Sequence, residues 1–238
     1  MPRLTVELIE RVAGYLNPLG DREFMARGLK IPVIENMGIL QDDYDCIDLS
    51  ENEIRRLGDF PPMKRLTSLV LANNSIDRIS GDVGRTLSNL KALVLTNNRI
   101  GNLGEVEQLT QLTNLEALSM IGNPVSRNAE YRAYVVYRMP WVKFVDFRRV
   151  SETERKEAAV LFATDSGKAL ETAISEGRIV EAESTAAGET ETRMKANMLT
   201  DAQKAVVRRA IQSAASREAV DDIEQMLKAG TFPFDSYA

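Results

Sequence analysis

The sequence predicts an α/β fold, a horseshoe-shaped solenoid whose parallel sheet has about six strands, with helical caps and a C-terminal helical extension. Three observations predict it. An apolar ladder interrupted by one asparagine recurs at nearly constant spacing, amphipathic segments flank that ladder, and the composition changes after residue 163. At 238 residues, the chain is long enough for one sizeable core with further segments attached.

The asparagines define the repeat. Asn52, Asn74, Asn98 and Asn123 are separated by 22, 24 and 25 residues (74−52, 98−74 and 123−98). Around each of them the apolar residues follow L-x-x-L-x-L-x-x-N-x-[IL], as in LVLANNSIDRI from Leu69 to Ile79. This pattern and period are those of leucine-rich repeats. Four near-complete copies at this spacing make the signal a strong one.

Two weaker copies flank the four, so about six strands are expected. They retain the apolar positions, namely Phe24, Ala26 and Ile31 upstream, with Leu29 in place of asparagine, and Val142, Val145 and Phe147 downstream. Leucines that point inward stack on those of the next repeat, because one repeat cannot bury its apolar face alone. The asparagine amide both donates and accepts hydrogen bonds, so it can pair with backbone groups where the chain leaves the strand. We therefore expect these asparagines to be structural.

Both ends of such a solenoid need covers. LTVELIERVAGYL predicts a short N-terminal helix with Thr5 as its N-cap and one apolar face, made of Leu8, Ile9, Val12 and Leu16. Residues 131–162 predict the C-terminal cap, in which Ser151 and Glu154 have the spacing of a capping box. We interpret the aromatic residues of this stretch as cap core rather than as a ligand-stacking surface; they are Tyr131, Tyr134, Tyr137 and Trp141. The repeat domain is thus predicted to occupy residues 1–163.

The remaining chain predicts two further segments. Residues 164–198 are rich in Ala, Glu, Thr, Ser and Gly, which is typical of a flexible linker. Residues 199–230 predict two short amphipathic helices, with N-terminal signals at Thr200 and Ser216 and a stop at Gly230. Their apolar stripes must be buried either against each other or on a partner.

The concave face of the sheet is the candidate protein-binding surface. By register it is lined by residues between the inward leucines, namely Glu23, Met25, Arg27, Cys46, Asp48, Ser50, Ser68, Val70, Ala72, Ala92, Val94, Thr96, Ala117, Ser119, Ile121, Phe144, Asp146 and Arg148. The centre of this set is small and apolar, which fits a partner helix lying across the sheet. If these residues merely faced solvent, they would leave an unexplained apolar patch. They contain no catalytic constellation, so we do not expect an enzyme.

Composition limits the other functions. The formal net charge is −5, so bulk charge does not favour nucleic acid. Basic residues do cluster near the two ends of the solenoid, and the candidates for RNA phosphate contacts are Arg22, Arg27, Lys30, Arg148 and Arg149. Ordinary solvated surface is the alternative. The chain has no histidine and one cysteine, Cys46, so neither a metal site, a cofactor nor an internal disulfide is expected. We also expect no signal peptide, no membrane segment and a reducing compartment, cytosol or nucleus.

Several blocks outside the general repeat pattern carry a resemblance to a known family. These blocks are KIPVIENMG (30–38), NPV (123–125), YRAYVVYRMPWVKFVDFRRV (131–150) and MLKAGTFP (226–233). Together they resemble the A-prime family of U2 small nuclear ribonucleoprotein components, over residues 2–162 and again over 199–233. The chain departs at Phe24-Met25-Ala26, where the family usually has Leu-Asp-Leu.

The resemblance implies a non-enzymatic splicing component in the nucleus. Family members hold an RNA-recognition-motif (RRM) protein, B-double-prime, by placing one of its helices in the concave trough. The pair then binds a stem-loop of U2 small nuclear RNA, mainly through the partner. The C-terminal helices would be available to other spliceosomal proteins. The alternatives are a generic repeat adaptor, such as a phosphatase regulatory subunit, and an acidic histone-binding repeat protein. The latter ranks last because residues 164–198 contain no long acidic run.

Overall fold

The computed structural model describes residues 3–12 and 14–175. All of them belong to one compact unit, Met1–Val180. The linker beyond residue 175 and the two helices predicted at 199–230 lie outside the described residues.

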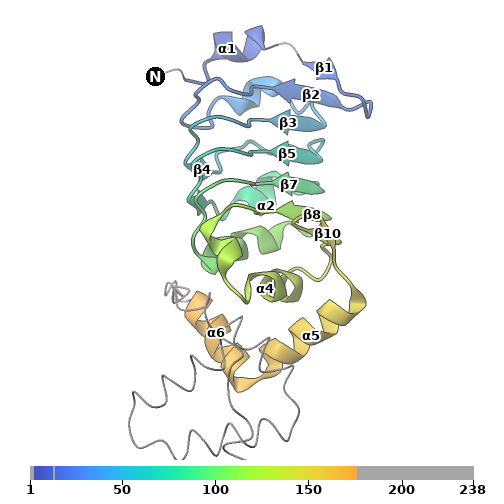
Figure 1. Ribbon diagram of the computed structural model, residues 1–238. Helices are drawn as coiled ribbons and strands as arrows, with labels where there is room; N and C mark the ends of the chain where they lie inside the picture. Colours follow the sequence, from blue (N-terminus) through green and yellow to red (C-terminus); the bar gives the residue numbers. More distant parts are fainter. Residues whose placement is uncertain (1–2, 13, 176–238) are drawn as a thin grey trace, which may run out of the picture. The chain divides into compact units, whose positions relative to one another are not determined.

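A single main sheet runs through the described part of the chain (Figure 1), and it has eight strands. In pairing order they are β1 (Tyr15–Leu16), β2 (Arg22–Met25), β3 (Cys46–Asp48), β5 (Ser68–Val70), β7 (Ala92–Val94), β8 (Ala117–Ser119), β9 (Phe144–Val145) and β10 (Arg148–Arg149). Neighbours from β2 to β9 pair in parallel, whereas β1 and β10 pair antiparallel at the two edges. The predicted repeat solenoid, with its parallel sheet of about six strands, is confirmed.

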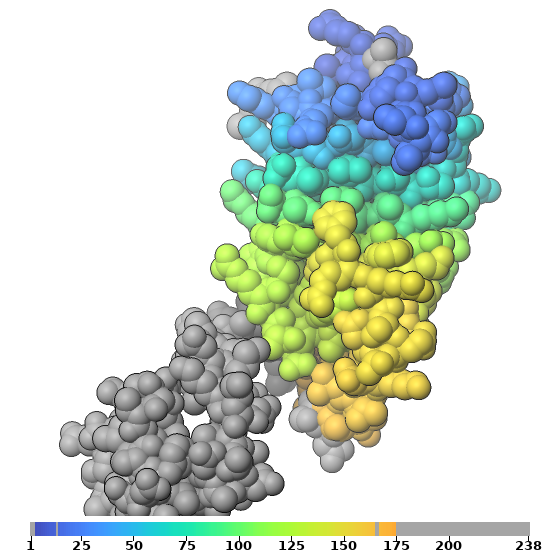
Figure 2. All heavy atoms as spheres, turned by 45° about the vertical axis from the view of Figure 1, so that its right-hand side comes forward, coloured from blue at the N-terminus to red at the C-terminus, as the bar shows by residue number. Residues whose placement is uncertain are grey.

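Short elements close each turn of the solenoid behind the sheet. They are η1 (Met37–Leu40), β4 (Arg56–Leu57), β6 (Arg78–Ile79), α2 (Val83–Thr86), α3 (Leu103–Glu107), η2 (Gln108–Gln111) and η3 (Pro124–Arg127), and β4 pairs with β6 in a small parallel sheet. Each repeat therefore has a strand on one side and a variable short element on the other. In the space-filling view the repeats form successive coloured bands (Figure 2).

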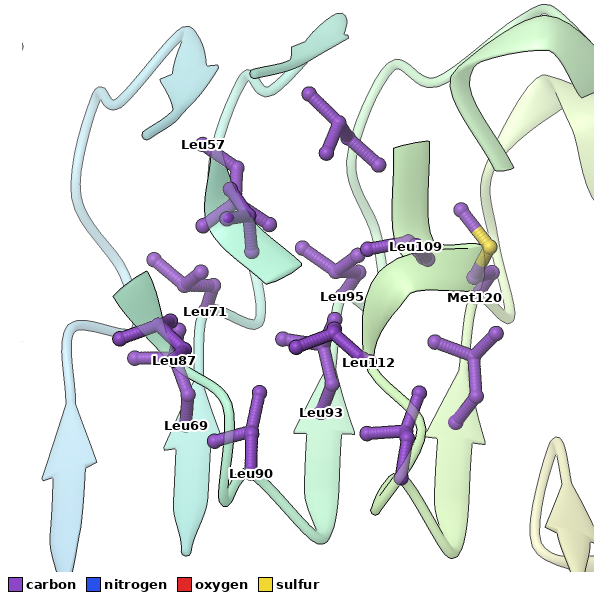
Figure 3. Close-up of a cluster of buried hydrophobic side chains, with 14 of the residues drawn as sticks. Leu57, Leu69, Leu71, Leu87, Leu90, Leu93, Leu95, Leu109, Leu112 and Met120 are labelled. Atoms are coloured by element: carbon purple, nitrogen blue, oxygen red, sulfur yellow. The ribbon is translucent and has the colours of Figure 1, made fainter. Parts of the chain in front are cut away.

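The core lies between these two sides. Leu69 on β5 and Leu93 on β7 are direct partners in register, and both are 0% exposed. Figure 3 shows them pointing from adjacent strands into the same interior, with Leu87 and Leu112 from the opposite side. Because burying one leucine contributes about 1.5–3 kcal/mol, the stacked columns of leucines supply most of the driving force for the solenoid.

The asparagines form a hydrogen-bonded ladder beside that core. The Asn98 amide nitrogen donates to the carbonyl oxygens of Leu71 and Leu95, each at 2.9 Å, and its carbonyl oxygen accepts the Ile76 N–H at 3.0 Å. Asn52, Asn74 and Asn123 make the corresponding bonds in their own repeats. Each asparagine thus joins its own repeat to the preceding one, which is the contact that a structural role requires.

The N-terminal cover is α1 (Val6–Arg11). The Thr5 hydroxyl oxygen accepts the Leu8 N–H at 3.3 Å, which confirms Thr5 as the N-cap, and Ile9 is buried. Leu16 does not continue the apolar face of this helix, contrary to the prediction from the sequence. It lies on β1 and is 67% exposed, because the helix ends at Arg11 and the chain turns into an edge strand.

The C-terminal cap contains α4 (Tyr131–Arg138), the β9–β10 hairpin and α5 (Glu152–Ala163). The predicted capping box is confirmed, since the Ser151 and Glu154 side chains each accept the other's backbone N–H. Tyr134 is buried and meets Phe162 edge to face at 5.6 Å between ring centroids. Tyr131 is also buried, and Tyr137 and Trp141 pack partly buried against the same core.

Phe147 is not the inward-facing residue that the weak sixth repeat predicts. Its side chain is 71% exposed. Asp146 and Phe147 both have positive φ, 54° and 59°, and the chain reverses there into β10 instead of turning toward the back of another repeat. Two consecutive left-handed residues make the tight hairpin turn that antiparallel strands favour.

A helix also stands where the flexible linker was expected to begin. α6 (Asp165–Ser175) follows α5 after Thr164, and Ile174 is 1% exposed. The Arg138 guanidinium donates to Glu171 at 2.9 Å and to Glu107 at 2.8 Å, so it joins α6 to the repeats. The composition of residues 164–198 did not predict α6, because this helix is attached to the repeats through one buried isoleucine and an ion-pair network.

Candidate protein-binding face

The candidate site is the concave face of the main sheet, made by alternate residues of its strands. Register aligns them in three columns across the repeats: Glu23, Cys46, Ser68, Ala92, Ala117 and Phe144; then Met25, Asp48, Val70, Val94, Ser119 and Asp146; then Arg27, Ser50, Ala72, Thr96 and Ile121. Adjacent strands in a sheet lie about 4.8 Å apart, so each column is a continuous row of side chains. The structure therefore brings the predicted face together on one surface, except for Arg148, which lies on the antiparallel edge strand β10 because the chain reverses after β9.

The middle of this face carries short side chains, and its ends carry larger ones. Ala72, Ala92, Val70 and Val94 are half-buried, and their short side chains allow another backbone to approach closely. Larger apolar side chains stand at the two ends of the columns, with exposures of 41% for Met25 and 42% for both Ile121 and Phe144. Cys46, Ser50 and Ser119 lie in the columns but are no more than 7% exposed, so they contribute little contact area of their own.

Acidic residues gather at the β2–β3 end. Burial raises the pKa of the Cys46 thiol to about 11, with further contributions from the nearby charges of Glu23 and Asp48. The Tyr15 hydroxyl on β1 also has a raised pKa, caused by desolvation and then by Glu23. Tyr15 was absent from the predicted face because β1 lies outside the repeat pattern, although its register partner is Glu23.

The two aspartates of the second column also hold the backbone. One Asp48 carboxylate oxygen accepts the Ser50 N–H at 2.8 Å, and one Asp146 oxygen accepts the Met120 N–H at 2.7 Å. These bonds fix both side chains against the sheet. A partner at this face would therefore meet carboxylates that are already oriented.

The five basic candidates for RNA phosphate contacts fall into two groups. At the first repeats, Arg22 lies 3.8 Å from the Asp43 carboxylate and Arg27 lies 2.5 Å from Glu51, so both are already paired. Lys30 is exposed in the loop that follows. At the other end, Arg148 and Arg149 of β10 are exposed. Neither forms an ion pair with any described residue.

The described residues contain neither a metal-binding cluster nor a membrane-spanning helix. Within residues 3–12 and 14–175, no cluster of three or more acidic or thiol side chains could hold a metal ion. Over the same residues, no helix is both long and apolar enough to cross a membrane.

The fold and its open, small-residue face define a class, the leucine-rich repeat proteins. A family model described as leucine-rich repeat matches residues 1–175. The chain is 40% identical over 233 residues to the probable U2 small nuclear ribonucleoprotein A′ of Caenorhabditis elegans, and the match covers 98% of this chain and 92% of the relative. It is 45% identical over 170 residues to U2 small nuclear ribonucleoprotein A′ of Homo sapiens, where the match covers 71% of this chain and 67% of the relative.

The similarity extends to a solved structure. A chain in the crystal structure of the Drosophila melanogaster SNF/U2A′ complex matches with a TM-score of 0.71 and 41% identity. The match covers 73% of this chain and 100% of that chain. The protein described above therefore belongs to the U2 small nuclear ribonucleoprotein A′ family, a family of non-enzymatic leucine-rich repeat scaffolds.

Proposed function

We propose that this protein binds an RRM protein of the B-double-prime type in its concave face and helps it bind a stem-loop of U2 small nuclear RNA during pre-mRNA splicing. The observation that carries the proposal is the similarity, at 41% identity, to a chain that was crystallised in the SNF/U2A′ complex. The protein would accordingly act in the nucleus, where the ribonucleoprotein named by its relatives belongs.

The geometry of the concave face supports a helix as the bound element. The short, half-buried side chains of Ala92, Val70 and Val94 lie between the larger and more exposed side chains of Met25 and Phe144. A helix with its side chains is about 10–12 Å across, so a helix that lies across the strands covers about three residues of each strand that it crosses. Apolar residues on its lower face would be desolvated against the valines, and its polar face would remain in water.

Charge supports a division of labour with RNA. The whole chain is acidic, and its basic candidates are few and local. Arg22 and Arg27 would have to break an ion pair with a carboxylate before they could bind a phosphate. Arg148 and Arg149 form no ion pair with a described residue, so they could bind a phosphate directly. We therefore assign base recognition to the RRM partner and supporting phosphate contacts to this protein.

Reconstitution with purified components tests the proposal. Fluorescence anisotropy of a labelled U2 stem-loop is measured with the protein alone, with the RRM protein alone and with both. We expect weak binding by this protein alone and a clear gain in affinity when both are present. Equal stem-loop affinity with and without this protein would refute the proposed role.

A salt titration of the ternary complex tests the phosphate contacts. Arg149→Ala should lower the slope of log K against log salt by about 0.7–0.9 for each phosphate that is no longer bound, equally for correct and mutated loops. Arg27→Ala should change the slope less, because Arg27 is already neutralised by Glu51. Arg85→Ala, an exposed arginine of α2, serves as the matched control. A loss of affinity confined to the correct loop would mean that this protein reads bases.

A further inference from the structure

The β9–β10 hairpin carries a turn residue, Phe147, that has no part in the concave-face proposal. Phe147 at its turn is 71% exposed and Phe144 on β9 is 42% exposed. Arg149 is the direct register partner of Phe144, and Arg148 follows Phe147 in the chain. Figure 2 shows atoms of this yellow segment standing out on the visible face, against the green bands of the preceding repeats. Two exposed aromatic rings and two exposed arginines thus share one short hairpin.

The backbone of the turn holds Phe147 in place at a conformational cost. Its φ of 59° lies in the left-handed region, which bulky residues rarely occupy. The preceding residue, Asp146, is fixed by its bond to the Met120 N–H at 2.7 Å and by its own N–H, which donates to the Leu118 carbonyl at 2.8 Å. A strained backbone conformation of this kind persists only where the surrounding contacts hold it in place, and such conformations are concentrated at functional sites. A glycine would occupy this position without strain, so packing does not explain the phenylalanine.

The charges around the rings favour an anionic ligand. Arg148 and Arg149 form no ion pair with a described residue, whereas Lys143 nearby is neutralised by Glu116 at 2.9 Å. The Asp146 carboxylate, the acidic group nearest in sequence, is engaged with the backbone of Met120. An exposed aromatic ring beside arginines that form no ion pair with a described residue is the arrangement that binds single-stranded nucleic acid, in which bases stack and phosphates meet guanidinium groups.

We propose that the β9–β10 hairpin binds single-stranded RNA, with an unpaired nucleobase stacked on Phe147 and the adjacent phosphates held by Arg148 and Arg149. This site rests on the proposed function and deepens its RNA-binding part. It assigns to this protein a direct contact with a base, made without base-edge hydrogen bonds and therefore tolerant of sequence.

The test uses the full chain without its RRM partner, so it does not depend on the concave face. The probe is a single-stranded RNA of roughly ten nucleotides that contains 2-aminopurine, whose fluorescence is quenched on stacking. The wild-type protein should bind it at low salt and quench it. Phe147→Leu, which keeps an apolar side chain and removes the ring, should lower the affinity roughly 5- to 150-fold and abolish the quenching.

Further variants separate this effect from folding and from general exposure. Phe147→Gly should lose quenching while its thermal midpoint stays equal to or above that of the wild type, because glycine accepts the left-handed φ. Leu19→Ala changes another exposed apolar residue, 85% exposed, and should leave RNA binding unchanged. Arg148→Gln and Arg149→Gln should each reduce the salt slope by about 0.7 without abolishing the residual quenching.

Two results would overturn the proposal. The first is unchanged affinity and quenching in Phe147→Leu. The second is the absence of wild-type binding at about 100 μM protein, the weak end of nonspecific nucleic-acid affinity. If unchanged RNA binding by Phe147→Leu were accompanied by weaker binding of the RRM protein in a separate titration, the hairpin would be a protein contact. Failure of the concave-face proposal would instead appear only in experiments that contain the partner.

Discussion

Replacing Asn98 with alanine tests the physical basis of the repeat. Asn98 is 5% exposed and joins three backbone segments through its side-chain amide. It donates to the carbonyl oxygens of Leu71 and Leu95 and accepts the N–H of Ile76. Alanine removes these three bonds, together with a longer one of 3.3 Å to the Thr96 carbonyl oxygen, and fills only part of the space.

The backbone groups are affected to different extents, and the Thr96 oxygen keeps its bond from the Asn73 N–H. The Leu71 oxygen still receives a bond from Asn74, and the Leu95 oxygen still receives one from Asn123. The Ile76 N–H has no other partner among the described groups, and Ile76 is 0% exposed. One orphaned buried donor costs about 1–3 kcal/mol, so we expect Asn98→Ala to reduce the free energy of unfolding by about 2–3 kcal/mol.

Urea unfolding followed by circular dichroism measures this reduction. Asn98→Asp is the informative companion, because an ionised carboxylate can accept from Ile76 but cannot donate to either carbonyl oxygen. Burial should raise the pKa of the new carboxyl group above its unfolded value, so this variant should become less stable as the pH rises. Wild-type stability in Asn98→Ala would refute the ladder argument.

Two further perturbations follow from the same structure. Gly122 has a φ of +78°, and a Cβ there would collide with the Asn97 side-chain oxygen. Gly122→Ala should therefore lower the free energy of unfolding in urea by about 1–3 kcal/mol. An unchanged urea midpoint would contradict this close approach. The hydrogen bond from Arg132, followed by that from the Ser151 backbone, holds the pKa of Glu154 at about 2 instead of 4.5. The ionised Glu154 carboxylate therefore stabilises the fold above its unfolded pKa, and this contribution is lost as the pH falls toward 2. Arg132→Met lacks the contribution, so acid should lower its free energy of unfolding by about 1–2 kcal/mol less than that of the wild type. Urea unfolding of both proteins at neutral and at acidic pH measures this difference. Equal acid sensitivity of the two proteins would contradict this role of Arg132.

Much of the fold could be predicted because the repeat is periodic. Alternation around Leu69 and Leu71 sets which residues face inward, and parallel register then places Val70 and Val94 on the opposite face. The columns of the concave face therefore follow from spacing alone. The binding role that we propose for them does not follow from spacing, because spacing carries no information on what covers these columns.

The ends of the solenoid were harder to predict because periodicity stops there. Phe147 has the spacing of an inward residue, yet two left-handed residues turn the chain away from the core. Leu16 continues a helical stripe in the sequence, yet it lies on an edge strand. Ile174 is anchored to the repeats with the help of Arg138 and Glu107, which lie far from it in the sequence. Such tertiary contacts leave no local pattern.

The most direct test of the central claim is the binding of the RRM protein by Val94→Arg, measured by isothermal titration calorimetry. Val94 is half-buried on the concave face and points away from the core, so thermal unfolding should be nearly unchanged. An arginine there must be desolvated without a partner beneath a bound helix, which should weaken binding by about 100-fold or more. Val33→Arg, at a position 52% exposed in the loop after the first repeat, should bind normally. Wild-type affinity in Val94→Arg would contradict the assignment of the concave face.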